Sequence, residues 1–263
     1  GKYKMIKETY ETLNDDVYGE DFLKPLMLSI EYDNREVTNK SFIKIDKELH
    51  IDHIIPQKFS SNAEWNYLDK EETEKYMNTL GNMALLYYKK NEEALNKGFI
   101  AKCNIYQGKN SEGTQNISGI TSFDTTREIV EVLSEGRNRD VDDIKRRAVK
   151  QMSRIEKLLN ININMIEKGE SQVDTNGNFY DRAVRFNFHD LGIANGETLT
   201  WYNDPTVTCE VIDEHNVLFN GERTTLSGIA RNKLGYNING AICFKHKGKT
   251  ISSIREDKEK AEK

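Results

Sequence analysis

The character of the sequence changes at Asn160, and this change limits the folds open to the chain. Before it, apolar residues recur at helical spacing over long stretches. After it come residues 161–178, rich in Asn, Ser and Gly, and then short runs bounded by turn residues. The sequence therefore predicts an α+β protein in two parts: a mainly helical domain, and a small α+β domain with an antiparallel sheet and one helix.

The predicted boundaries follow from the same change in pattern. We expect a helical domain over residues 1–160, a linker over 161–179, a second domain over 180–255 and a frayed, charged tail over 256–263. In the first domain we expect two N-terminal helices, strands at 49–55 and 82–88, and helices at 91–103, 125–133 and 141–159. In the second domain we expect strands at 183–188, 197–202, 207–212, 217–219 and 241–245, with a helix at 225–234.

Composition excludes several classes of protein. No apolar run approaches the roughly 20 residues of a membrane span, and no apolar signal core follows the first residues. Cys103, Cys209 and Cys243 are far apart and never in CxxC spacing, which argues against a disulfide framework or a cysteine zinc site and indicates a cytoplasmic protein. Because the chain begins at Gly1 without an initiator Met, we interpret it as a fragment of a longer protein.

The distribution of charge matters more than the total. With 38 Lys and Arg against 43 Asp and Glu, the net charge of −5 argues against a nucleic-acid partner. Two segments are nevertheless basic: residues 137–157 have eight basic and four acidic residues, and residues 223–255 have seven basic residues and no acidic one. Such segments are either solvated surfaces or faces that bind a phosphate backbone. The candidate DNA contacts among them are Arg146, Arg147, Lys150, Ser227, Arg231, Lys245 and Lys247.

The residues of greatest chemical interest lie at the predicted strand 49–55. Asp52 and His53 are adjacent and are followed by a loop that contains Pro56, which puts a general base beside a ligand for a hard cation. An isolated Asp-His pair is more often structural than catalytic. Asn82 and Asn91, nine residues apart across a strand-to-helix junction, strengthen the catalytic interpretation.

Together these residues resemble the HNH (His-Me finger) nuclease core, the ββα-metal fold in which a hairpin and a helix hold one divalent ion. The resemblance implies that His53 is the base that activates water and that Asp52 and Asn91 bind the metal. It also implies that Asn82 fixes the loop and the His53 ring. Oxygen ligands of this kind suit Mg²⁺ or Mn²⁺.

A more specific pattern extends beyond the core: HIDHIIPQ at residues 50–57, Trp65, LGNMALL at residues 80–86, and then Asn91-x4-Asn96-x2-Phe99-x2-Lys102. This pattern resembles the C-terminal nuclease domain of GmrSD-type restriction endonucleases, with Met83 in place of the usual Leu. The resemblance implies an Arg-bearing helix after the core, which residues 137–157 would supply, and a preceding nucleotide-dependent domain outside this chain. Lys102 is either a phosphate contact or a solvated lysine.

Other interpretations of these residues stay open. His50 and His53 have the HxxH spacing of a zinc site, although positions 50 and 53 of a strand face opposite sides. Asn96 would hold its helix in place or touch substrate. The aromatic residues Trp65, Tyr67, Tyr87 and Tyr88 are more typical of packing than of base stacking.

The second domain resembles the RAMA domain, a small module associated with recognition of modified DNA. The matching features are the VxFxG segment at 217–221, the helix start at Thr225 with Ser227 and Ala230, and the Asn-Gly pair at 239–240. Ala241 and Phe244 stand where the family usually has Trp. Ser227 is either part of a helix N-cap or a phosphate contact.

These observations lead to the hypothesis of a modification-dependent restriction endonuclease that cuts double-stranded DNA at an HNH site. Two alternatives stay open: a DNA-binding or regulatory module with an inactive nuclease core, and an HNH nuclease that acts on RNA. The sequence leaves open the modification that is recognised and whether two chains pair to cut both strands.

Overall fold

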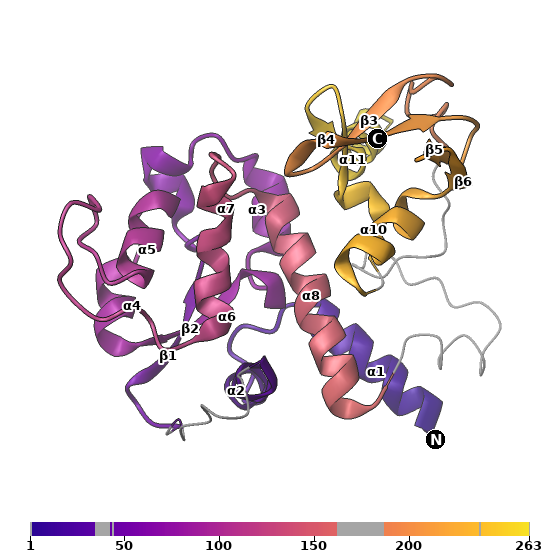
Figure 1. Ribbon diagram of the computed structural model, residues 1–263. Helices are drawn as coiled ribbons and strands as arrows, with labels where there is room; N and C mark the ends of the chain where they lie inside the picture. The colour runs from indigo at the N-terminus through magenta and orange to yellow at the C-terminus, as the bar shows by residue number, and fades with distance from the viewer. Residues whose placement is uncertain (1, 35–42, 44, 162–186, 237, 263) are drawn as a thin grey trace. The chain divides into compact units, whose positions relative to one another are not determined.

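Two compact units divide the chain, Gly1–Glu170 and Ser171–Lys263 (Figure 1). The computed structural model describes residues 2–34, 43, 45–161, 187–236 and 238–262. The first unit is mainly helical and the second is a six-stranded antiparallel sheet with helices, which confirms the predicted α+β class. Residues 162–179 of the predicted linker and 183–186 of the predicted first strand of the second domain lie outside the described residues.

A two-stranded hairpin organises the first unit. β1 (Leu49–His53) pairs antiparallel with β2 (Met83–Tyr87), with Leu49 opposite Tyr87 and His53 opposite Met83. Both strands were predicted, and β2 is buried except at Tyr87. The long connection between the strands returns the chain to the end of β1, so residues 80–82 lie beside the loop that follows His53.

The rest of the described part of the first unit is mainly helical, and α4 (Tyr88–Ala94) packs against both strands of the hairpin (Figure 1). The other helices are α1 (Lys2–Asn14), α2 (Leu23–Asn34), α3 (Lys70–Tyr76), α5 (Phe99–Tyr106), α6 (Asp124–Arg127), α7 (Glu131–Ser134) and α8 (Val141–Leu159), with 3-10 turns η2 (Phe59–Ser61), η3 (Ala63–Trp65), η4 (Leu80–Asn82) and η5 (Glu128–Val130). None of the helices in the described ranges is long and apolar enough to cross a membrane.

The helix predicted at residues 91–103 is two helices, α4 and α5. Between them Leu95 has a positive φ of 29°, which ends α4. Gly98 then donates its N–H to the Glu64 carboxylate at 3.1 Å, and a Cβ at this glycine would lie 2.5 Å from the Glu64 Cδ. A tertiary contact therefore breaks the helix at a place that helical periodicity does not mark.

The longest helix, α8, begins and ends where the sequence predicts. Asp140 and Asp143 form a capping box at its start, and Asn160 ends it in the left-handed conformation with φ 49°. The helix packs against α2, α3 and η4. At Gly81 in η4 the approach is so close that a Cβ would lie 2.0 Å from the backbone oxygen of Ile144.

The second unit is a single sheet in the order β6-β5-β4-β3-β7-β8, and every neighbouring pair is antiparallel. The strands are β3 (Thr198–Trp201), β4 (Asp204–Val211), β5 (Val217–Phe219), β6 (Glu222–Thr224), β7 (Phe244–His246) and β8 (Lys249–Thr250). The other elements are α10 (Leu226–Leu234), η6 (Gly240–Ile242) and α11 (Ile251–Ala261). Trp201 packs edge-on against Phe244 in the core, with ring centroids 5.1 Å apart.

The prediction of one helix in this unit and a frayed tail is wrong, because α11 occupies the tail. The Thr250 side chain accepts the N–H of Ser253 and caps this helix, and Ile251 in its first turn is fully buried. The cap and the buried Ile251 attach this helix to the sheet, and Lys258 further along it donates to the backbone oxygen of Asp190.

Candidate active site

Asp52, at the end of β1, lies in an interior ion pair. Its two carboxylate oxygens accept from the Lys102 ammonium of α5 at 3.1 and 2.9 Å, and Oδ2 also accepts from the Tyr106 hydroxyl at 2.9 Å. Lys102 donates to the backbone oxygen of His53 at 2.6 Å. Burial and the Asp52 charge raise the pKa of Tyr106 well above its usual value, so the hydroxyl remains a donor. The helix α5 therefore fixes both residues at the strand end.

This ion pair changes the interpretation of Lys102. Its side chain has no exposed surface, and its ammonium is shared between Asp52 and the His53 carbonyl. Lys102 is therefore not a solvated lysine in this structure, and its ammonium is occupied by protein oxygens. Nothing in the local sequence distinguishes it from a solvated lysine.

The His53 imidazole is buried beside polar groups. Its Nε2 lies 3.0 Å from Oδ1 of Asn78, and the Tyr18 ring packs against it with centroids 4.2 Å apart. Burial lowers the pKa of His53, and the hydrogen bond to Asn78 opposes that shift only in part. The ring is therefore neutral near pH 7, the state that a general base requires.

Asn82 fixes the loop that follows His53. Its side chain accepts the N–H of Ile55 at 2.9 Å and donates to the carbonyls of Ile55 and Met77, each at 2.9 Å. Its backbone oxygen accepts the N–H of Ile54 at 2.9 Å. These contacts match the expected role toward the loop, but the hydrogen bond of the imidazole goes to Asn78. The spacing of the motif residues does not single out Asn78.

Asn91 lies on α4, which follows β2 directly and packs against both strands. Its side chain is partly buried and makes no hydrogen bond within the part of the chain that the structure describes. Among the described residues, no three His, Cys, Asp or Glu side chains gather in a way that could hold a metal. This also leaves the zinc alternative at His50 and His53 without a third ligand among them.

Carboxylate and amide oxygens, such as those of Asp52 and Asn91, are of the type that a hard cation prefers. Asp52 already holds one cation, the Lys102 ammonium, and Asn91 offers an amide oxygen without a competing donor in the described residues. Mg²⁺ commonly uses one or two protein oxygens together with water and substrate phosphate. A metal at this position would compete with Lys102 for Asp52.

A comparison with known families identifies the family of the first unit. Residues 2–153 match the family described as GmrSD restriction endonucleases, C-terminal domain. The chain belongs to this family. It is thus part of a nuclease of a restriction system, for which DNA is the implied substrate. No curated protein and no solved structure gives a significant match.

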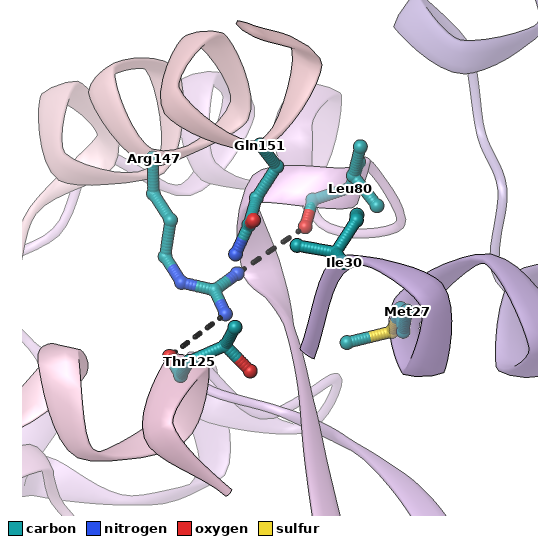
Figure 2. Close-up of a pocket in the computed structure, with 6 residues that line it drawn as sticks. All are labelled: Met27, Ile30, Leu80, Thr125, Arg147 and Gln151. Carbon is teal, nitrogen blue, oxygen red and sulfur yellow. Dashed lines mark hydrogen bonds between the residues drawn. The ribbon is translucent and has the colours of Figure 1, made fainter. Parts of the chain in front are cut away.

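In this GmrSD-type domain, the arginines of α8 point inward. Arg147 donates to the carbonyl oxygens of Met83 at 2.7 Å and Thr125 at 3.3 Å, and Arg139, just before the helix, donates to Gly81 at 3.1 Å. Figure 2 shows the Arg147 guanidinium in a small crevice that is lined by Met27, Ile30, Leu80, Thr125, Arg147 and Gln151. The arginines thus hold the backbone on both sides of Asn82.

The other predicted DNA contacts on α8 have protein partners as well. Arg146 is buried and pairs with Asp143 at 2.8 Å, while Lys150 is more exposed and pairs with Glu128 at 3.0 Å. Arg146 and Arg147, both predicted as phosphate contacts, are buried and directed at oxygen atoms inside the domain.

The three basic residues predicted to contact DNA in the second unit are more exposed than Arg146 and Arg147. Arg231 on α10 and Lys247 after β7 are exposed, and Lys245 on β7 is partly buried. Lys247 lies 2.8 Å from a Glu197 carboxylate oxygen at the surface. These side chains remain accessible to a polyanion.

Ser227 has a structural contact of its own. Its hydroxyl oxygen accepts the N–H of Gly240 at 2.9 Å and so joins α10 to η6. Gly240 is needed at this junction, because a Cβ there would lie 2.4 Å from the Ser227 nitrogen. The hydroxyl oxygen of Ser227 therefore already contributes to the fold of the unit.

The aromatic and amide residues near the hairpin have mixed roles. Trp65 is buried and donates from its indole N–H to the Lys97 carbonyl at 3.1 Å, as packing predicts. Asn96 donates to the Ser61 hydroxyl at 3.0 Å, which favours the structural alternative. Tyr18 and Tyr88 are exposed at 45% and 43% and lie against His53 and His50, respectively.

Proposed function

We propose that the chain is a metal-dependent HNH endonuclease that hydrolyses DNA phosphodiesters in a modification-dependent restriction system. The observation that carries this proposal is the adjacent Asp52 and His53 at the end of β1, with the following loop held by Asn82. Membership of a restriction endonuclease family supports the reaction class.

The proposed chemistry assigns a role to each of these residues. The His53 ring takes a proton from water, the water oxygen forms a bond to phosphorus, and the P–O bond to the leaving oxygen breaks. Asp52 and Asn91 would hold Mg²⁺ or Mn²⁺, which when bound offsets negative charge on the phosphate. Lys102 and Tyr106 keep the Asp52 carboxylate in place.

The test is cleavage of supercoiled plasmid with Mg²⁺, with Mn²⁺ and with a chelator. We expect His53→Ala to lose cleavage by at least about 100-fold while its circular dichroism spectrum is unchanged. Asn66→Ala, at an exposed position of the same unit, is the matched control and should cut normally. Full cleavage by His53→Ala would reject His53 as the base.

The metal ligands need a separate experiment. If Asn91 is a ligand, Asn91→Ala should require more metal for half-maximal cleavage and recover at high metal concentration. Asp52→Asn should lose more, because it removes a charge from the site. An unchanged metal dependence in both variants would reject Asp52 and Asn91 as metal ligands.

For the second unit, we propose a RAMA-like role in selecting modified DNA. The exposed Arg231 and Lys247 and the partly buried Lys245 support binding to the DNA backbone. The test compares cleavage of matched unmodified, methylated, hydroxymethylated, glucosylated and phosphorothioated DNA. Equal rates on all five would contradict a role in selection.

A second candidate function is a DNA-binding module with an inactive core. The Lys102 ammonium on Asp52 favours it, because it already neutralises the carboxylate expected to bind metal. Plasmid that stays intact in both metals, with retained DNA binding, would favour this candidate. Matched RNA substrates in the same assay test the remaining alternative, a ribonuclease.

A further inference from the structure

Asn78, just before η4, connects three parts of the candidate active site. Its Oδ1 lies 3.0 Å from Nε2 of His53 and 3.5 Å from Nε2 of Gln57. Its Nδ2 lies 3.4 Å from Oδ2 of Asp16. The residue is outside the sequence motif and has no role yet in the proposed chemistry.

The Asp16 contact fixes which way the Asn78 amide points. A carboxylate only accepts hydrogen bonds, so the amide group that faces Asp16 must be the NH₂. The oxygen then faces His53 and accepts from Nε2, which must carry the proton. Nδ1 is left with the lone pair of the neutral ring.

The backbone of Asn78 strengthens this arrangement. Its carbonyl oxygen accepts the N–H groups of Val17 at 3.0 Å and Tyr18 at 3.3 Å. Val17 is fully buried, and the Tyr18 ring lies against the His53 ring. The segment after α1 is thus attached to Asn78, and it restricts the imidazole from the side.

We infer that Asn78 is a positioning residue that holds His53 with Nε2 protonated and leaves Nδ1 as the atom that accepts the proton of water. The role in catalysis rests on the proposed function. In the reaction, the water proton goes to Nδ1, the water oxygen bonds to phosphorus, and the P–O bond breaks with its electron pair going to the leaving oxygen, which takes up a proton from solvent. The Nε2–H bond stays intact and continues to donate to Asn78.

The first test does not depend on cleavage. Long-range ¹H–¹⁵N correlation spectra of the full chain, labelled at histidine and recorded at pH 8, report which ring nitrogen carries the proton. The His53 signals are assigned by their loss in His53→Ala. We expect protonated Nε2 with a proton resonance protected from exchange with water, and loss of that protection in Asn78→Ala but not in Asn66→Ala. Protonated Nδ1 in the wild type, or equal protection in Asn78→Ala, would overturn the inference.

The second test separates positioning from folding. On supercoiled plasmid, Asn78→Ala should lower kcat by about 10- to 100-fold with little change in KM. Asn78→Asp combined with Asp16→Asn exchanges the carboxylate and the amide, so the acceptor for Nε2 and the hydrogen bond between the two side chains are both retained. This double variant should recover most of kcat, whereas Asn78→Asp alone places two carboxylates together and should recover less.

The two tests distinguish failure of the proposed function from failure of the inference about Asn78. A wild-type chain that does not cut plasmid but has a protected Nε2–H would overturn the proposed function and keep the placement of the ring. Normal cleavage by the Asn78→Ala variant would support the proposed nuclease function but would reject Asn78 as its positioning residue.

Discussion

The basic residues predicted to contact DNA have different surroundings in the two units. In the first unit Lys102, Arg146 and Arg147 are buried, and each binds carbonyl or carboxylate oxygens of the protein itself. In the second unit Arg231 and Lys247 are exposed. The contrast shows that a count of basic residues does not identify a DNA-binding face when the same side chains can serve as internal donors.

Buried basic side chains of this kind have a specific structural use. Arg147 and Arg139 supply donors to backbone carbonyls in and next to η4. Arginine suits this role because its guanidinium offers five donors in a fixed plane. The first unit therefore uses positive charge to order the backbone around Asn82, and the second unit leaves its positive charge accessible.

The largest expected effect in this comparison is that of Lys102→Met. The change leaves the buried Asp52 carboxylate without its cation, which should lower the free energy of unfolding by roughly 4 kcal/mol in urea denaturation. The double variant with Asp52→Asn removes the unpaired charge and should be more stable than Lys102→Met alone. A stable Lys102→Met protein with weaker DNA binding would instead place Lys102 among the DNA contacts.

Arg147→Met should have the next largest effect. It removes donors from the carbonyls of Met83 and Thr125 in a buried crevice, at a cost of about 3 kcal/mol in the free energy of unfolding. Lys150→Met on the same helix is the matched control, because its ion pair with Glu128 is more exposed, and it should cost less than about 1 kcal/mol. Equal losses of unfolding free energy in the two variants would contradict the distinction between buried and exposed basic side chains.

The pH dependence of the free energy of unfolding tests Asp143, the acidic partner of Arg146 and Arg137. Burial alone would raise the pKa of Asp143, but Arg146 and Arg137 hold it well below its usual range. A depressed folded-state pKa stabilises the protein above the unfolded value of about 4 and loses that contribution as the pH falls below it. The free energy of unfolding from urea denaturation should therefore fall by about 1 kcal/mol more for the wild type than for Asp143→Asn between pH 7 and pH 3. Parallel curves would show that the ion pairs contribute little.

The smallest effect on stability is expected in the second unit. Replacing Arg231, Lys245 and Lys247 together by Gln should change the free energy of unfolding by less than about 1 kcal/mol. DNA affinity should fall, and the slope of log Kd against log salt should decrease by up to about 2.7, or about 0.9 for each lost phosphate contact. An unchanged salt slope, measured by fluorescence anisotropy, would show that this surface does not meet DNA.

The sequence predicts the regular elements of the first unit well. The spans of β1 and α8 follow from a short β-branched run and from helical periodicity, and β2 lies within the strand predicted at 82–88. It does not predict the break between α4 and α5, which depends on a contact between Gly98 and Glu64 across 34 residues. It also misses α11, because a composition typical of a frayed tail hides its cap.

For the candidate site, the sequence alone singles out residues that are adjacent to one another or lie within a recognisable motif. Asp52 and His53 are adjacent, and Asn82 lies within a recognisable segment. The role of Asn78 depends on contacts with Asp16 and His53, which are 62 and 25 residues away. The burial of Lys102 likewise depends on how α5 packs against the strand end, and nothing in the sequence around it indicates this.

The contact at Gly81 offers a way to control the enzyme. Any side chain there would push against the backbone of α8 at Ile144, although no chemical group proposed for the reaction would be altered. The Gly81→Ala protein would be complete in its chemistry yet poorly docked, and heating would worsen this. Position 81 is therefore a natural choice for building a temperature-conditional nuclease that is produced safely when warm and regains its activity on cooling.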